Sequence, residues 1–323
     1  MSVPQVPRPG GAEATQRTFR ICLIDESVTK SQLHEWLRTL KFPLHPSVDS
    51  RDTVDDNVLA LSLVPSYDGS QTAAVTFSHT PRMFIPCKPR RHIDIAVEIG
   101  GIRNDEIVID CDFYGMTPLY ICAEPGPTVD IIGVPGLSSH AFGTWKDSNG
   151  HKMWLRDFLC KERGLKDCAR ILIYGYDSIL KDSTSTMTIR DHSRKLLDLV
   201  RSVRSEPEST LGTVLTVYIY LPLHWWSLIK NKHADGQWKK TGPPVRLVTM
   251  RSARGAVPTE ASHDQVPIDT DHSEMVKFGS RADVNYITAR DRLKDCVEWP
   301  QTLAKASEIA ANQIFEMDGK NTY

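Results

Sequence analysis

A serine that attacks an acyl carbon is presented on a sharp strand-to-helix turn with the pattern G-x-S-x-G. The turn is needed because it lifts the hydroxyl group out of the sheet. No stretch of the 323-residue chain carries this pattern. Ser178 follows Gly175 by three residues and has no glycine at the spacing that the pattern requires, so we interpret it as part of a polar turn. The sequence therefore predicts a chain without efficient serine catalysis.

The other residues that could do chemistry form no metal or phosphate motif. The seven cysteines are scattered and never spaced as C-x-x-C, which indicates reduced thiols in an intracellular compartment. The glycines from Gly136 to Gly143 are not followed by the Lys and Ser/Thr of a phosphate-binding loop. We expect no metal and no cofactor. The basic run Lys88–His92 is typical of a solvated loop, and we expect no nucleic acid partner.

The elements that would position these residues begin with a strand, a helix and two strands. Residues 19–24 are predicted to form a strand, and Thr29 with Gln32 makes a capping box before an apolar helical stripe. Strands are expected at residues 58–64 and 72–77, on either side of an Asp-Gly turn. This order resembles an RNA-recognition motif, but the positions that would stack bases hold Cys22, Thr72 and Ala74 instead of aromatic residues.

Strands and helices alternate in the second part of the chain, which predicts an α/β layered fold. Buried strands are expected at residues 129–134 and 169–176, and helices at residues 153–162 and 188–203. Later strands are expected at residues 214–221 and 245–250, with a terminal helix at residues 303–317.

Several ordered blocks resemble a fungal family of serine hydrolases related to the DUF676 and SERAC types. The blocks are VDIIGVPGLSSHAFGTWK, MWLRDFL, ARILIYGYDS and IRDHSRKLLDLVRSVR, and near the end WKKTGPPVRLVTMRSA and IDTDHSEMVKFGSRADVNY. The resemblance implies a truncated α/β-hydrolase-like fold, with a mostly parallel sheet and helices on both faces, preceded by a small α+β module. It implies a disordered tail over residues 1–17, the small module over 18–124, the incomplete hydrolase-like domain over 128–300, and a C-terminal helix and tail over 301–323.

The resemblance also assigns roles to individual residues. His272 matches the family's catalytic base, here vestigial because no serine is available for it to activate. Leu137 and Ser138 lie where the family keeps its oxyanion segment, but Pro135 in the same loop has no N–H to donate. Between Ser205 and Gln237 the chain lacks the strand, nucleophile and helices that the family places there.

Three functions remain open at this point. The first is a degenerate lipase- or esterase-like domain that acts as a noncatalytic binding module, with a lipid, an acyl group or a protein as its ligand. The second is a working ester or lipid hydrolase whose catalytic segment is missing from this sequence. The third is an RNA-binding module in the front part of the chain. For the first, we expect a partner that covers residues 214–229, because a shortened sheet exposes its edge.

Charge and hydropathy limit the classes of partner and the cellular location that we expect. A net charge of −1 supplies no global field for nucleic acid or an anionic membrane. Residues 209–229 contain no Asp, Glu, Lys or Arg, but Gly212, Pro222 and His224 interrupt the segment, so we expect a buried strand there and not a spanning helix. We expect no targeting signal in the first residues, which are rich in Pro, Gly and small polar residues. We expect a cytoplasmic protein, and the family resemblance adds association with the membrane of the mitochondrion or endoplasmic reticulum.

Overall fold

A computed structural model describes twelve parts of the chain, which form two compact units. The described parts are residues 17–41, 57–123, 126–136, 139–177, 187, 189–204, 215–220, 226–228, 231–232, 238–239, 244–246 and 274–298. The first unit comprises the described residues up to Leu63 together with Ser70–Cys111, and the second comprises Val64–Gly69 and the described residues from Asp112 onward.

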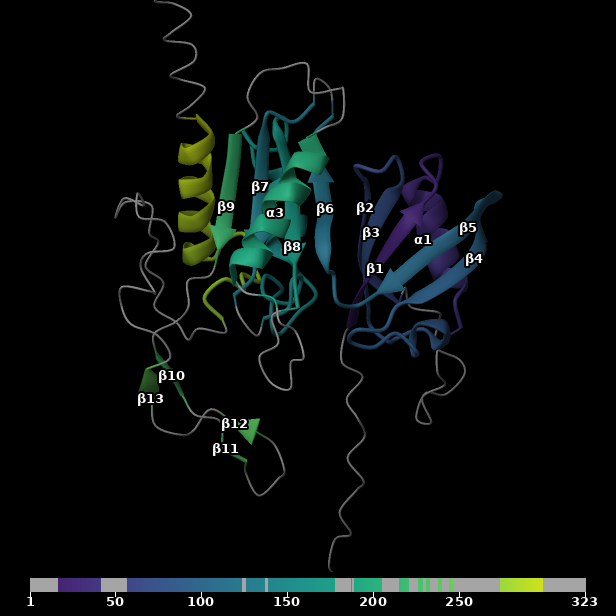
Figure 1. The fold of residues 1–323 in the computed structure, drawn as a ribbon, viewed down its shortest axis with the longest axis horizontal. Helices are drawn as coiled ribbons and strands as arrows, with labels where there is room; N and C mark the ends of the chain where they lie inside the picture. The colour runs from purple at the N-terminus through teal and green to yellow at the C-terminus, as the bar shows by residue number, and fades with distance from the viewer. Residues whose placement is uncertain are drawn as a thin grey trace, which may run out of the picture. The chain divides into compact units, whose positions relative to one another are not determined.

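The first unit is built on a five-stranded sheet with the strand order β2-β3-β1-β5-β4 (Figure 1). Its central strand β1 pairs antiparallel with both β3 and β5, and β5 pairs antiparallel with β4. The elements are β1 (Arg17–Ile24), α1 (Lys30–Thr39), β2 (Val58–Pro65), β3 (Gln71–Phe77), the single 3₁₀ turn η1 (Arg82–Phe84), β4 (Ile93–Ile99) and β5 (Ile102–Asp110).

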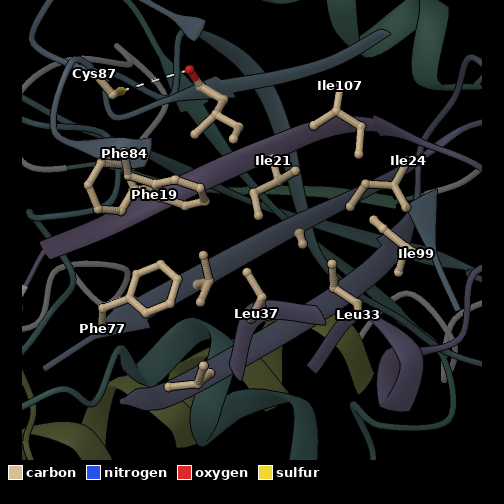
Figure 2. Close-up of a cluster of buried hydrophobic side chains, with 14 of the residues drawn as sticks. Phe19, Ile21, Ile24, Leu33, Leu37, Phe77, Phe84, Cys87, Ile99 and Ile107 are labelled. Carbon is tan, nitrogen blue, oxygen red and sulfur yellow. Dashed lines mark hydrogen bonds between the residues drawn. The ribbon is translucent and has the colours of Figure 1, made fainter. Parts of the chain in front are cut away.

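Helix α1 covers one face of this sheet, and its start is fixed by the predicted capping box. The Thr29 hydroxyl accepts a hydrogen bond from the Gln32 amide at 3.3 Å, and the Gln32 side chain accepts one from the Thr29 amide at 2.9 Å. Leu33 and Leu37 of the helix are fully buried in the same core as Phe19 of β1 (Figure 2). This confirms the predicted helix and the strand before it.

The hairpin of β4 and β5 was not predicted from the sequence. The two strands are joined by Gly100 and Gly101, both with a positive φ. A two-residue turn with both φ angles positive matches the twist of an antiparallel hairpin and favours glycine at both positions. Along β4 the side chains alternate between half-buried and exposed, as expected for an edge strand.

The opposite face of the first sheet carries polar pairs. Arg20 on β1 donates to the carboxylate of its register partner Asp110 on β5 at 2.7 Å, and both side chains are nearly buried. Next to them, the Thr18 and Thr76 hydroxyls lie 2.9 Å apart. On this face β1 presents threonine, arginine and cysteine where an RNA-recognition motif would present stacking rings.

The second unit contains a mixed sheet with the order β6-β8-β7-β9. Strand β7 lies parallel to both β8 and β9, whereas β6 lies antiparallel to β8. Its strands are β6 (Gly115–Ile121), β7 (Val129–Val134), β8 (Ala169–Gly175) and β9 (Leu215–Tyr220). Pro118 lies in the edge strand β6 at a shift of register, which is where a residue without an N–H is tolerated.

Helices and short ladders complete the second unit. Helix α3 (Ile189–Arg204) lies over the strands of the mixed sheet (Figure 1). Its Val200 and Val203 belong to the same core cluster as Ile132 of β7 and Leu172 of β8. A further helix runs over residues 284–298. The expected helix over residues 153–162 is divided into the short α2 (Trp154–Asp157) and the turn η2 (Leu159–Lys161). Two small ladders pair β10 (Trp226–Leu228) with β13 (Pro244–Arg246) and β11 (Asn231–Lys232) with β12 (Trp238–Lys239).

The predicted fold class was wrong. The larger sheet is mostly antiparallel and the smaller one is mixed, with few helices, so the chain does not form the expected truncated α/β-hydrolase-like, mostly parallel sheet with helices on both faces. The front module also departs from the RNA-recognition motif, because β3 is followed by a single 3₁₀ turn and a hairpin where that motif has its second helix. The error arose because the β4–β5 hairpin was overlooked and β6 was not recognised as the antiparallel partner of β8.

The segment that resembled a membrane span contains strand β9, as predicted. Within the described residues, no helix has the length and apolar content needed to cross a membrane. The terminal helix expected at residues 303–317 lies outside the described residues.

Candidate functional site

The loop after β7 is the part of the second unit where the sequence predicted functional residues. Strands β7 and β8 are parallel, so their carboxyl ends lie at the same edge of the sheet, where open sheets with helical connections bind ligands. The two ends are tied together, because the hydroxyl group of Tyr176, just after β8, donates to the carbonyl oxygen of Pro135, just after β7, at 3.1 Å. The loop therefore leaves the sheet beside an aromatic side chain that holds it.

His140 organises the next part of this loop. Its Nδ1 accepts hydrogen bonds from the amides of Phe142 at 3.1 Å and Gly143 at 2.9 Å, and its carbonyl oxygen accepts one from the Thr144 hydroxyl at 2.7 Å. An accepting Nδ1 carries no proton, so a neutral ring has its proton on Nε2. As a result, the amides of Phe142 and Gly143 are directed at the protein's own imidazole.

Two glycines allow the loop and its flanks to pack closely on the strands. A Cβ atom at Gly175 would lie 1.9 Å from the carbonyl oxygen of Phe113, and one at Gly133 would lie 2.9 Å from Leu155 and 3.1 Å from Trp145. At Gly175 the neighbour is backbone, so glycine is required there for the two chain segments to approach. At Gly133 the nearest atom is the end of the Leu155 side chain, which would have to shift to admit a Cβ atom.

An aromatic group lies beside the ends of β7 and β8. The rings of Tyr174 and Tyr176 stack with centroids 5.8 Å apart, and the ring of His192 on α3 lies 4.8 Å from that of Tyr176. Burial raises the pKa of both tyrosines, so both phenols stay protonated and serve as hydrogen-bond donors. The Nδ1 atom of His192 is buried, with no hydrogen-bond partner among the described residues. Both phenols donate within the chain, Tyr176 to Pro135 and Tyr174 to the carbonyl oxygen of His192 at 3.2 Å.

Asp130 is a buried carboxylate within strand β7. It accepts hydrogen bonds from Arg170 on β8 at 2.8 Å and from Arg204 at the end of α3 at 3.0 Å. Arg170 also donates to the carbonyl oxygen of Val203 at 3.0 Å. Two arginines on one carboxylate compensate its burial and attach the end of α3 to the sheet.

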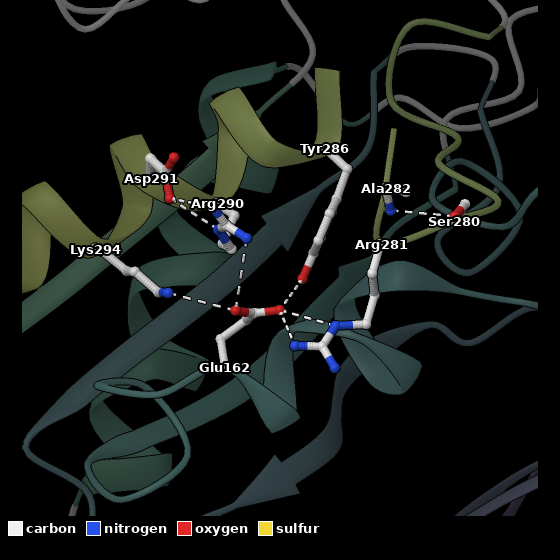
Figure 3. Close-up of polar contacts among 8 residues, drawn as sticks. All are labelled: Glu162, Ser280, Arg281, Ala282, Tyr286, Arg290, Asp291 and Lys294. Carbon is white, nitrogen blue, oxygen red and sulfur yellow. Dashed lines mark hydrogen bonds and ion pairs between the residues drawn. The ribbon is translucent and has the colours of Figure 1, made fainter. Parts of the chain in front are cut away.

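Glu162 is another buried carboxylate of the second unit, and side chains from the last described stretch of the chain bind it (Figure 3). It accepts hydrogen bonds from Arg281 at 2.7 Å, from the Tyr286 hydroxyl at 2.9 Å and from Lys294 at 3.3 Å. Burial acts to raise the pKa of Glu162, but these hydrogen bonds outweigh it and hold the pKa below its ordinary value. The ionised carboxylate thereby anchors the helix over residues 284–298.

The residues that the resemblance singled out, Leu137, Ser138 and His272, lie outside the described residues. Ser178 lies outside them as well. The vestigial base and the oxyanion segment therefore stay predictions. Among the described residues, no group of three His, Cys, Asp or Glu side chains is arranged to hold a metal ion.

Sequence reasoning missed the residues that organise this region. Asp130 was the most visible of them, because a carboxylate inside the apolar run VDIIGV needs a buried partner, and Arg170 in the strand ARILIY is a natural one. Tyr176 and His140 gave no comparable signal, because a tyrosine and a histidine in loops are usually solvated.

Comparison with known proteins finds no counterpart for this chain, since no family model matches it and no curated protein or solved structure is significantly similar to it.

Proposed function

We propose that this chain is a noncatalytic binding module that lacks the serine nucleophile of the lipase- and esterase-like domains that its sequence resembles. The observation that carries the proposal is the bond pattern of His140. Oxyanion stabilisation needs backbone N–H groups that point at the developing charge. In the described part of the loop after β7, the amides of Phe142 and Gly143 donate to His140 instead. The buried carboxylates of Asp130 and Glu162 are also used within the chain, because each forms ion pairs with arginine side chains.

We infer that the ligand is an extended protein segment that pairs with β9. The strand order places β9 at one end of the mixed sheet, and among the described strands it pairs only with β7. An edge strand offers a row of backbone groups that an incoming strand can complete. The sequence letters of β9, LTVYIY, are β-branched, aromatic or leucine, a composition that favours a strand.

Hydrogen exchange of the isolated chain tests the edge. In a parallel pair, alternate amides of β9 bond to β7 and the others point outward. We expect the amides of Leu215–Tyr220 to divide into a protected and an unprotected set. Uniform protection would mean that the outer side is already covered within the chain, and it would contradict this choice of ligand.

A fluorophosphonate probe tests the absence of catalysis. We expect no labelling of the purified chain above that of a heat-denatured control. Labelling that disappears on substitution of one serine would establish a working hydrolase and overturn the proposal. A transcript with an additional in-frame G-x-S-x-G segment between Arg204 and Trp238 would favour the same alternative.

A further inference from the structure

Two thiols lie together in the core of the first unit. Cys87 follows η1 and is fully buried, and Cys111 directly follows β5 with 9% of its surface exposed. The Cys87 Sγ donates to the carbonyl oxygen of Ile109 at 3.8 Å, which brings it against the end of β5 (Figure 2). Cys111 is also the main cause of a raised pKa at the Cys87 thiol, so the two side chains are neighbours in this core.

Arg17 on β1 contacts both members of this pair. Its Nη2 donates to the Cys111 Sγ at 3.8 Å and to the Cys87 carbonyl oxygen at 3.4 Å. A guanidinium group beside a sulfur favours the thiolate, which is the reactive form of cysteine. The two thiols are therefore unequal, because Cys111 has the cation at its sulfur whereas Cys87 has only its backbone contacted.

The surroundings of Cys87 divide the roles further. The neighbouring Cys111 raises the pKa of Cys87, and burial adds to the effect, so Cys87 keeps the proton that it donates to the Ile109 carbonyl oxygen. A thiol beside a guanidinium group and next to a protonated, buried thiol is the arrangement in which one cysteine is oxidised first and the other resolves the product.

We propose that Cys111 and Cys87 form a peroxide-sensitive thiol pair, in which Cys111 is oxidised first and Cys87 closes an intramolecular disulfide. The Cys111 thiolate attacks one oxygen of hydrogen peroxide, the O–O bond breaks, and Cys111 becomes a sulfenic acid while hydroxide leaves. The Cys87 sulfur then attacks the Cys111 sulfur, the S–O bond breaks, and the thiol proton leaves with the hydroxyl group as water. The proton that Cys111 releases when it ionises converts the hydroxide to water, so in total two thiols lose two electrons and the peroxide is reduced to two waters.

The disulfide would join the start of the β4–β5 segment to its end. Its loop contains the whole hairpin from Ile93 to Asp110, so it would constrain the unfolded chain over about 25 residues. We expect oxidation to raise the Tm of the first unit by roughly 5 to 10 °C, and a dithiol reductant to reverse the change.

The test uses the full chain treated with hydrogen peroxide, blocked with an alkylating reagent and mapped by mass spectrometry without reduction. We expect one peptide pair joined through Cys87 and Cys111, while the exposed Cys296 reports that oxidant was present. Oxidation of Cys296 with both core thiols still alkylated would overturn the proposal. So would conversion of Cys111 to sulfinic or sulfonic acid without a crosslink.

Variants separate the two roles. In Cys87→Ser, Cys111 should stop at the sulfenic acid and react with a dimedone probe, whereas Cys111→Ser should leave Cys87 unlabelled. Arg17→Gln should slow disulfide formation about tenfold, because it removes the cation beside the Cys111 sulfur that favours the reactive form. The control Arg103→Gln removes an exposed arginine of the same unit that pairs with Asp105, and it should leave the rate unchanged. Equal rates for the Arg17 and Arg103 variants would contradict the role of Arg17.

Discussion

Arg170 on β8 donates from Nε to the Oδ1 atom of Asp130 on the neighbouring strand β7 at 2.8 Å. The Asp130 carboxylate is 1% exposed, and its second oxygen accepts from Arg204 of α3 at 3.0 Å. One side chain thus joins two parallel strands and the end of the helix that covers them.

Replacement of Asp130 by asparagine should lower the free energy of unfolding by about 3 kcal/mol, because Arg170 and Arg204 lose their counter-charge in a site with little water. Urea denaturation measures the effect. The control is Asp198→Asn on the outer surface of α3, where an exposed pair with Arg201 contributes below about 0.5 kcal/mol. Equal losses from the two variants would contradict the anchoring role of Asp130.

Glu162 makes the free energy of unfolding depend on pH in the acid range. The pKa of Glu162 is held below its ordinary value, so its contribution is fully present above the unfolded-state pKa of about 4.3. It is lost as the pH falls through the lower pKa of the folded state. We expect Glu162→Gln to cost about 2 to 3 kcal/mol at pH 7 and progressively less below pH 4 or so.

Denaturation of the wild-type chain and the Glu162→Gln variant between pH 3 and 7 checks this. Glu274→Gln is a suitable control, because that carboxylate is more exposed and contacts Lys277 near the surface. A Glu162 effect that stays constant over the whole range would mean that the ionised carboxylate is not the source of the stability.

Local signals account for the elements that the sequence predicted correctly. The capping box of Thr29 and Gln32 and the apolar strands around Phe19 and Ile132 each depend on a few neighbouring residues. The β4–β5 hairpin also had a local signal in Gly100-Gly101 between alternating residues, and it could have been predicted.

The missed helix over residues 284–298 shows how the family resemblance misled the prediction. Asp283 accepts hydrogen bonds from the amides of Asn285 at 2.8 Å and Tyr286 at 3.3 Å, as a helix N-cap does. That signal was present in the sequence, but the block was interpreted as part of a histidine loop.

The environment of Glu162 could not have been predicted. Its partners Arg281, Tyr286 and Lys294 lie 119, 124 and 132 residues further along the chain. No pattern within a short window links an acidic residue to cations at such separations. Only the packing of the helix over residues 284–298 brings them together.

The His140 turn can be tested by one disruptive and one conservative change. His140→Ala removes the acceptor of two backbone amides and should cost about 1 to 2 kcal/mol. His140→Asn should restore most of this, because an asparagine oxygen can accept from amides two and three residues ahead. Hydrogen exchange of the Phe142 and Gly143 amides gives the local measurement. Protection that is unchanged in the alanine variant would contradict the assignment of the imidazole as acceptor.

Gly175 should be the least replaceable glycine in the described part of the second unit. Alanine there would place a Cβ atom 1.9 Å from the Phe113 carbonyl oxygen, and the two elements involved are backbone, which cannot rotate away. We expect Gly175→Ala to cost more than about 3 kcal/mol or to prevent folding of the unit. Gly143→Ala is the contrast, because its Cβ atom would meet only the His140 side chain, at 3.3 Å, and should cost about 1 kcal/mol or less. Circular dichroism and thermal melting of both variants measure the difference. If the Gly175→Ala chain is as stable as the Gly143→Ala chain, the loop before β6 does not pass over the end of β8 as described.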